Sequence, residues 1–202
     1  MSLQDVRTYI LSEHGEELEV PLDTLCPNNR IECKVPAIDY DKLRKRIVGE
    51  KCTSADALII GKWISFIEFK TGCAKENKSI KIETQKENLQ LAIRLKAYES
   101  LALFEKVILP MGGFESDIID EKKRFVAVVD SVEYANDALI DVLADASDRK
   151  DEATTFKKQL HDWLKSKLSN YRKEFGDGKH IFYVDTQVWY DYEVPQKIKM
   201  IR

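Results

Sequence analysis

The clearest pattern of hydrophobic positions in the chain lies in two short runs, residues 55–60 and 63–70. Both runs are rich in β-branched and aromatic residues, which is typical of buried strands rather than short helices. Gly61 lies between them and indicates a turn. The pattern therefore predicts a pair of adjacent strands near the middle of the first half of the chain.

Other segments show helical or alternating periodicity. The predicted helices cover 3–13, 38–48, 83–106 and, in two pieces separated by the charged stretch 145–152, the region from Tyr134 to about Gly176. The predicted strands cover 30–35, 124–130 and 180–192, the last as one or two aromatic strands. The long central helix has an apolar band wide enough to pack against a sheet.

This order of elements predicts an α/β fold with a central mixed β-sheet flanked by helices. We expect residues 1–132 to form the α/β core. Residues 133–202 would add a helical and β-strand extension packed on the same domain. The length of 202 residues and the hydrophobic content of 44% are sufficient for a sizeable core.

The balance of basic and acidic side chains limits the kinds of nucleic-acid binding that the chain could perform. The 32 basic and 35 acidic side chains leave a formal net charge of −3, which argues against a protein that coats nucleic acid by bulk charge. A local basic groove around an acidic metal site stays compatible with this balance.

The cysteines and the start of the chain indicate the cellular compartment in which we expect the protein. None of the four cysteines forms a closely spaced pair, which argues against a structural zinc site. No signal peptide opens the chain and no apolar run is long enough to span a bilayer. We expect a soluble cytoplasmic protein with free thiols and no membrane partner.

Three charged side chains at the predicted strand pair suggest chemistry. Asp56 begins the first strand, and Glu68 and Lys70 end the second. Mg²⁺ prefers one or two carboxylates together with waters and substrate phosphate. Lys70 lies two residues after Glu68, so both side chains point to one face of the strand. There its ammonium could orient an attacking water or stabilise charge that develops at phosphorus. The backbone carbonyl of Phe69 is a further candidate ligand.

This arrangement resembles the PD-(D/E)xK nuclease superfamily, which has the restriction-endonuclease-like fold. The matching residues are Ala55-Asp56 and Glu68-Phe69-Lys70. The resemblance implies a Mg²⁺-dependent (or Mn²⁺-dependent) nuclease, an endonuclease in which Asp56 and Glu68 hold the metal and Lys70 is the catalytic lysine. It covers about the first two-thirds of the chain. The family's proline before the aspartate is replaced by Ala55 here.

Two observations limit how specific this motif is. An acidic residue two positions before a lysine also occurs at 32–34, 76–78, 121–123, 148–150 and 177–179. Only Glu68 ends a strongly apolar strand that follows another strand bearing an acid. The alternative is that Glu68 and Lys70 simply keep the exposed edge of a hairpin soluble.

The geometry of the hairpin provides a test. A strict two-residue turn at 61–62 would place Asp56 opposite Ile67, on the face away from Glu68. A three-residue loop at 61–63, or one bulge, would place Asp56 opposite Glu68. The nuclease hypothesis therefore requires the odd offset.

Supporting residues follow from the resemblance and from charge. Nucleases of this superfamily often add an acidic residue from the first helix, for which we favour Glu13, and a polar residue from the helix after the second strand, for which Gln85 and Gln90 are candidates. Each of them could equally be an ordinary surface residue. The basic residues that could contact a phosphate backbone are Lys42, Arg44, Lys45 and Arg46.

We therefore expect hydrolysis of phosphodiester bonds in nucleic acid, with DNA favoured over RNA. A homodimer or a larger assembly stays open. The alternative function is a catalytically inactive nuclease-like scaffold that binds a protein or a nucleic acid.

Overall fold

The structure is a computed structural model that describes residues 2–27, 30–71, 82–120, 122–130, 146–169 and 182–201. Over these residues its centre is a sheet of six strands in the order β1-β2-β3-β4-β5-β6. The strands are β1 (Glu19–Pro21), β2 (Pro36–Asp39), β3 (Ala57–Ile60), β4 (Ile64–Lys70), β5 (Lys123–Val129) and β6 (Asp185–Tyr190). Neighbours from β1 to β4 run antiparallel, and β4, β5 and β6 run parallel. The sheet is open and mixed.

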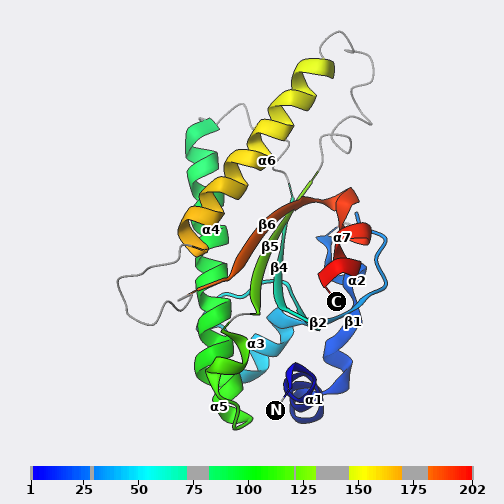
Figure 1. Cartoon of the computed structure of the whole chain (residues 1–202), viewed down its shortest axis with the longest axis vertical. Helices are drawn as coiled ribbons and strands as arrows, with labels where there is room; N and C mark the ends of the chain where they lie inside the picture. The colour runs from blue at the N-terminus through cyan, green and yellow to red at the C-terminus, as the bar shows by residue number, and fades with distance from the viewer. Residues whose placement is uncertain are drawn as a thin grey trace.

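Helices cover both faces of this sheet, as Figure 1 shows with α4 and α6 on one side and α2 and α7 on the other. The α-helices are α1 (Leu3–His14), α2 (Leu22–Leu25), α3 (Tyr40–Val48), α4 (Ile82–Leu103), α5 (Leu109–Met111), α6 (Ala146–Leu168) and α7 (Val194–Ile201). Short 3₁₀ turns cover Glu16–Leu18, Ser116–Ile119 and Asp191–Glu193, and a π-helical turn, Phe104–Ile108, joins α4 to α5. The predicted α/β class with a mixed sheet between helices is confirmed.

The two faces of the sheet bury separate hydrophobic clusters. Alternate residues of β4, such as Ile64 and Phe66, pack with α1, α3, α4 and α6. Their neighbours Ile67 and Phe69 pack with α2 and α7 on the opposite face. A strand buried on both faces reads as a continuous apolar run rather than an alternating one. This explains the unbroken hydrophobic run in β4.

The predicted strand pair forms with a three-residue loop. Ile60 pairs with Ile64 and Ala57 pairs with Ile67, so residues 61–63 connect the strands. Asp56 lies just before this ladder, and its backbone N–H donates to the Ile67 carbonyl. The odd offset that the nuclease hypothesis requires is present.

Several predicted boundaries are wrong. Residues 30–35 do not form a strand. Their alternation reflects burial of Ile31 and Cys33 in the cluster on the α2 and α7 face, and the carbonyl oxygens of Cys33 and Val35 accept backbone hydrogen bonds from the start of α2. The segment is therefore bonded to a helix end instead of a neighbouring strand.

The C-terminal part also differs from the prediction. The charged stretch 145–152 does not interrupt a helix, because α6 begins at Ala146 and continues through it; Arg, Lys, Glu and Ala are good helix formers whatever their charge. The first predicted helical piece, up to residue 144, lies outside the described residues. The aromatic tail forms one strand, β6, followed by the unexpected helix α7, whose first turn contains Pro195.

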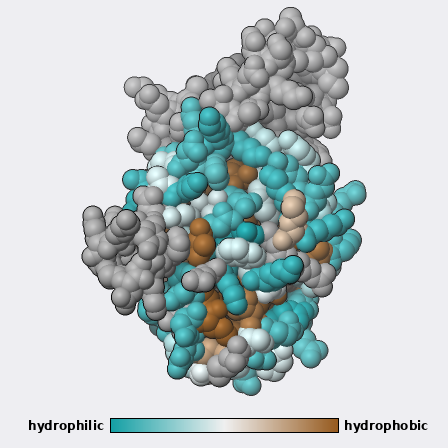
Figure 2. All heavy atoms as spheres, in the orientation of Figure 1, coloured by the Kyte–Doolittle hydropathy of each residue, from teal (hydrophilic) through white to brown (hydrophobic). Residues whose placement is uncertain are grey.

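The described residues of the face drawn in Figure 2 are largely polar. Figure 2 shows hydrophilic side chains over most of one face, with smaller apolar patches between them. No helix among the described residues is long and apolar enough to cross a membrane. Cys26, Cys33 and Cys52 are free thiols, as expected.

Candidate active site

The candidate site begins with two carboxylates on neighbouring strands. Asp56 immediately precedes β3, and Glu68 lies near the end of the neighbouring strand β4. Alternation along β4 places Glu68 on the face of Phe66, which belongs to the cluster packed against α4. Asp56 reaches the same place, because the ammonium of Lys96 on α4 contacts both carboxylates. The two acids therefore point to the same interior surface.

The position of Asp56 is fixed by β4. Its backbone N–H donates to the carbonyl of Ile67 at 3.0 Å, and its Oδ2 accepts the backbone N–H of Phe69 at 2.7 Å. The N–H and C=O of one strand residue point to the same side of the strand. The Phe69 carbonyl is therefore directed toward the Asp56 side of β4, where a further oxygen ligand was predicted.

Two ammonium groups meet these carboxylates. Lys70 Nζ lies 2.7 Å from Glu68 Oε1. Lys96, which projects from α4, places its Nζ 2.9 Å from both Glu68 oxygens and 3.2 Å from Asp56 Oδ1. The two negative and two positive charges cancel. We refer to Asp56, Glu68, Lys70 and Lys96 as the carboxylate–lysine cluster.

The anchoring of α4 explains why Lys96 reaches the sheet. One helical turn beyond Lys96, Ser100 is buried and its Oγ accepts the backbone N–H of Ala55 at 2.7 Å. The hydroxyl of Tyr40 donates to the Ser100 carbonyl at 2.9 Å. These bonds hold α4 over the start of β3. Side chains four positions apart share a helix face, so Lys96 faces Asp56.

Burial strongly affects the ionisation of the cluster. The Glu68 side chain is fully buried. Burial, reinforced by the nearby charge of Asp56 and opposed by Lys96 and Lys70, raises the pKa of Glu68 to about 7. Burial opposes the charge on Lys96, but Glu68 and Asp56 outweigh it and raise the pKa of Lys96. Glu68 is thus a carboxyl group that titrates near neutral pH beside two lysine side chains.

The raised pKa of Glu68 predicts that stability depends on pH. The folded protein holds this proton more tightly than the unfolded chain, so stability falls as pH rises from about 4.5 to about 7. The full contribution is about 3 kcal/mol. We expect Glu68→Gln to flatten the pH dependence of the free energy of unfolding, measured by urea denaturation in a chelating buffer between about pH 5 and about pH 8.

A matched control is Glu13→Gln, which removes an exposed carboxyl group of α1. Its pH dependence should follow the wild type. If Glu68→Gln and the wild type lose stability in parallel over this window, the buried carboxyl does not titrate there and the assignment is wrong.

Other residues predicted for the site lie elsewhere. Glu13 is exposed on α1 and makes no contact with the cluster in the part of the chain that the structure describes. Gln90 is half-buried on α4, and the side chain of Gln85 lies outside the described residues. The helix residue that reaches the cluster is Lys96, on a different face of α4 from Gln90.

The predicted basic residues lie on α3 and are largely engaged in ion pairs. Arg44 is buried between Asp41 and Glu50, at 2.7 and 2.8 Å. Lys45 pairs with Asp41 at 2.9 Å, Arg46 pairs with Glu17 at 2.5 Å, and Lys42 is exposed. Three of these four side chains are therefore already paired with carboxylates of the protein. They would have to give up those ion pairs to bind a phosphate.

Two further buried acids end the parallel strands, and both line a small pocket together with Lys70. Asp130 follows β5 and Asp191 follows β6, and both are buried. Alternation places Asp130 on the face of Val126 and Val128, the face covered by α2 and α7. There it pairs with Arg30 at 3.0 Å.

A signal for Lys96 is present in the sequence, although the strand motif did not lead to it. Ile93, Ala97 and Ser100 form the stripe of α4 that is buried against the sheet, and Lys96 falls within the same stripe. A single lysine among apolar and small residues on the buried face of a helix indicates a buried acidic partner. Glu68, at the end of a strand buried on both faces, is such a partner.

Comparisons of this chain with protein-family models, curated proteins and solved structures gave no match. The functional assignment therefore depends on the cluster itself.

Proposed function

We propose that this protein is a Mg²⁺-dependent nuclease with a restriction-endonuclease-like core, which hydrolyses phosphodiester bonds of DNA or RNA. The observation that carries the proposal is that the carboxylates of Asp56 and Glu68, from adjacent strands, meet at the ammonium of Lys96, with Lys70 in contact with Glu68. These three residues were predicted from the sequence, and the three-residue loop brings them to one face.

The donor set fits a hard divalent cation. The cluster offers carboxylate oxygens from Asp56 and Glu68 together with the Phe69 carbonyl, and Mg²⁺ commonly keeps water and phosphate as its other ligands. The carboxylates already bind a cation, the ammonium of Lys96. No group of three or more His, Cys, Asp or Glu side chains that could hold a metal occurs in the described residues, so two carboxylates are the anionic ligands available there.

Charge also supports this assignment. If a divalent cation takes the place of the Lys96 ammonium, the charges of Asp56, Glu68, Lys70 and the ion sum to +1. One phosphodiester group carries one negative charge, so a bound substrate restores neutrality. A metal-loaded site that becomes neutral when its substrate binds favours binding of that substrate.

The protein's own residues then have defined roles. Asp56 and Glu68 would hold Mg²⁺, which when bound polarises a phosphoryl oxygen and lowers the pKa of a coordinated water. Lys70, two residues beyond Glu68 on the same face, would stabilise the negative charge that develops at phosphorus. The attacking water would form the new P–O bond and lose a proton to solvent, and the P–O ester bond would break as the departing oxygen takes a proton from solvent. Burial by α4 limits competing water around Glu68.

The direct test is cleavage of end-labelled single- and double-stranded DNA and RNA by the purified chain. We expect cleavage with Mg²⁺ or Mn²⁺ and none in a chelating buffer. Calorimetric titration with Mn²⁺ alone should show binding to the wild type and much weaker binding to Glu68→Gln. Absence of both cleavage and Mn²⁺ binding would overturn the proposal.

The role of Lys70 has its own test. Lys70→Ala should abolish cleavage while leaving Mn²⁺ binding in place, because the ammonium acts on the substrate and the carboxylates bind the ion. Cleavage assays and calorimetric titration of the same preparation measure the two effects. Loss of rate with metal binding retained separates a role in the reaction from a structural one, and an unchanged rate removes Lys70 from the mechanism.

One observation favours a second candidate, an inactive nuclease-like scaffold. Lys96 already neutralises the carboxylates at hydrogen-bonding distance, so the cluster is electrically satisfied without metal. Such a protein would leave Mn²⁺ unbound even at millimolar concentration and would bind its partner through another surface. Mn²⁺ titration therefore separates the two functions.

A further inference from the structure

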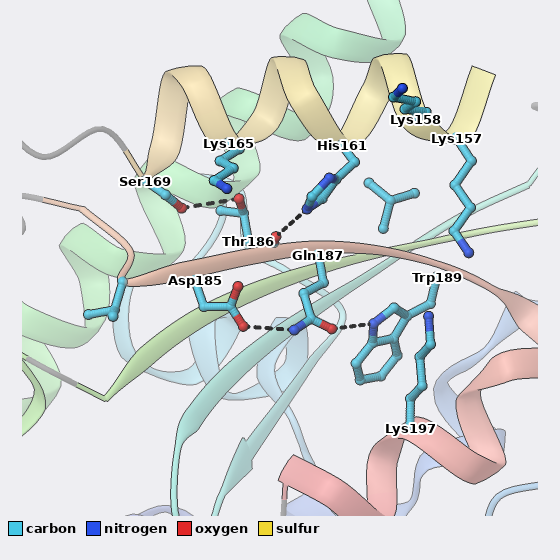
Figure 3. A pocket seen from close by; sticks show the side chains of 12 residues that line it. Lys157, Lys158, His161, Lys165, Ser169, Asp185, Thr186, Gln187, Trp189 and Lys197 are labelled. Atoms are coloured by element: carbon cyan, nitrogen blue, oxygen red, sulfur yellow. Dashed lines mark hydrogen bonds between the residues drawn. The ribbon is translucent and has the colours of Figure 1, made fainter. Parts of the chain in front are cut away.

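A cavity of about 520 Å³ lies between α6, the edge strand β6 and α7. It is a groove along β6, since every residue from 184 to 189 lines it. Its other walls carry the lysines Lys157, Lys158, Lys165 and Lys197, together with His161. Figure 3 shows Lys157 and His161 pointing from α6 toward β6, and Lys197 pointing toward it from α7 below. We call it the β6 groove.

The charge in the β6 groove is strongly one-sided for a chain of net charge −3. Asp185 is the acidic residue that lines it, and Arg124 pairs with that carboxylate at 2.7 Å. Lys157 and Lys197 share Glu193 at 2.5 and 2.9 Å. The remaining lysines therefore leave the groove with a net positive charge, which attracts an anion.

Two of those lysines are regularly placed on α6. Lys158 and Lys165 are exposed and seven residues apart, which is two turns of one helix face and roughly 10 Å along the axis. His161 lies between them. A row of separated cations fits a ligand with repeated negative charges better than it fits one isolated anion.

The walls of the β6 groove are fixed. His161 Nε2 donates to the carbonyl of Thr186 at 3.1 Å, and Ser169 Oγ donates to Thr186 Oγ1 at 3.1 Å. The first bond ties α6 to a backbone carbonyl of the edge strand β6, so α6 lies against the strand that a peptide would have to extend. This argues for ligand contacts through the lysine side chains and against an acidic peptide that extends the sheet.

One end of the β6 groove offers a surface for a base. Tyr192 follows β6, is 57% exposed and stacks on Tyr190, with ring centroids 5.5 Å apart. Lys157, at the same end, lies 4.6 Å above the Tyr190 ring. An exposed aromatic ring beside a positively charged groove is the combination that binds unpaired bases and their backbone.

We propose that the β6 groove binds the sugar–phosphate backbone of a single-stranded nucleic acid, with a base stacked on Tyr192. A cavity of about 520 Å³ between a helix and a strand accepts one backbone, whereas a duplex would touch only its rim. β4, β5 and β6 are parallel, so Tyr192 lies at the same end of the sheet as Glu68 and Lys70, where these strands have their carboxyl ends. Because β6 and β4 are two strand spacings apart, about 10 Å, the bound strand becomes a substrate of the cluster if the proposed nuclease function holds.

The test is fluorescence anisotropy of a labelled single-stranded oligothymidylate with the full chain in a chelating buffer, where no cleavage occurs. We expect Lys158→Gln/Lys165→Gln to weaken binding about tenfold and to reduce the slope of log K against log salt by about 1.4, for two lost contacts with a single strand. The matched control is Lys51→Gln/Lys106→Gln, two exposed lysines that do not line the β6 groove. The control should bind as the wild type does.

An equal loss of affinity in both double variants, or no loss in either, would show that the β6 groove is not the binding site. Tighter or equal binding of a duplex or of polyglutamate, with the same dependence on Lys158 and Lys165, would overturn the single-strand assignment. The two proposals fail separately. Binding without cleavage in Mg²⁺ leaves the groove and removes the nuclease, whereas cleavage that is unchanged in Lys158→Gln/Lys165→Gln leaves the nuclease and removes the groove.

Discussion

Replacing Asp56 by Asn should lower the rate of Mg²⁺-dependent cleavage by a factor on the order of 10³. The side chain keeps its shape and an oxygen that can accept the Phe69 N–H, now at 2.7 Å, but it loses the negative charge that would hold the metal. Loss of several kcal/mol of charge stabilisation corresponds to this factor. Single-turnover cleavage rates at saturating Mg²⁺ measure it.

The fold should survive this change, because Asp56 is a quarter exposed and its backbone bond to Ile67 is retained. Thermal melting in chelating buffer checks this. The matched control is Asp117→Asn, an exposed aspartate in a 3₁₀ turn, which should cut at the wild-type rate. If Asp56→Asn cuts as fast as Asp117→Asn, Asp56 holds no catalytic metal.

The sheet was predictable where hydrophobic runs are long. The strands containing Leu58, Phe66 and Phe125 are buried on both faces, so their pattern stands out from sequence alone. The hairpin offset was not predictable, because Gly61 is compatible with loops of two or three residues. That offset decides whether Asp56 and Glu68 share a face. The sequence could therefore predict the site only on the condition that the loop has three residues or that a bulge is present.

Tertiary contacts account for the errors. Residues 30–35 have the alternation of a strand, but the carbonyls of Cys33 and Val35 bond to α2, a choice made by packing and not by local propensity. The groove along β6 depends on α6 and α7 meeting the edge of the sheet, and α7 was not expected at all. Lys96 was not predicted because the motif lies on the strands, whereas this lysine reaches them from the buried stripe of α4.

Lys96→Met should destabilise the metal-free protein by about 3 kcal/mol, because a fully buried Glu68 then loses one of its two cations while Asp56 stays close. Urea denaturation in a chelating buffer measures this. Lys106→Met, which removes an exposed lysine from the turn that follows α4, is the matched control and should change stability little.

Added Mn²⁺ should reverse this loss and stabilise Lys96→Met more than the wild type, since the ion and the ammonium compete for the same oxygens. In the wild type the displaced ammonium has a place to go: Lys96 also lines a cavity of about 330 Å³ whose walls include Asp41, Glu50 and Glu99. In the wild type, metal binding therefore requires the Lys96 ammonium to move from Asp56 and Glu68 to this second acidic cavity. The free energy of that move reduces the stabilisation that Mn²⁺ provides. Equal stabilisation of both proteins by Mn²⁺ would show that the metal binds away from Lys96, and the cluster would then be a structural ion-pair network.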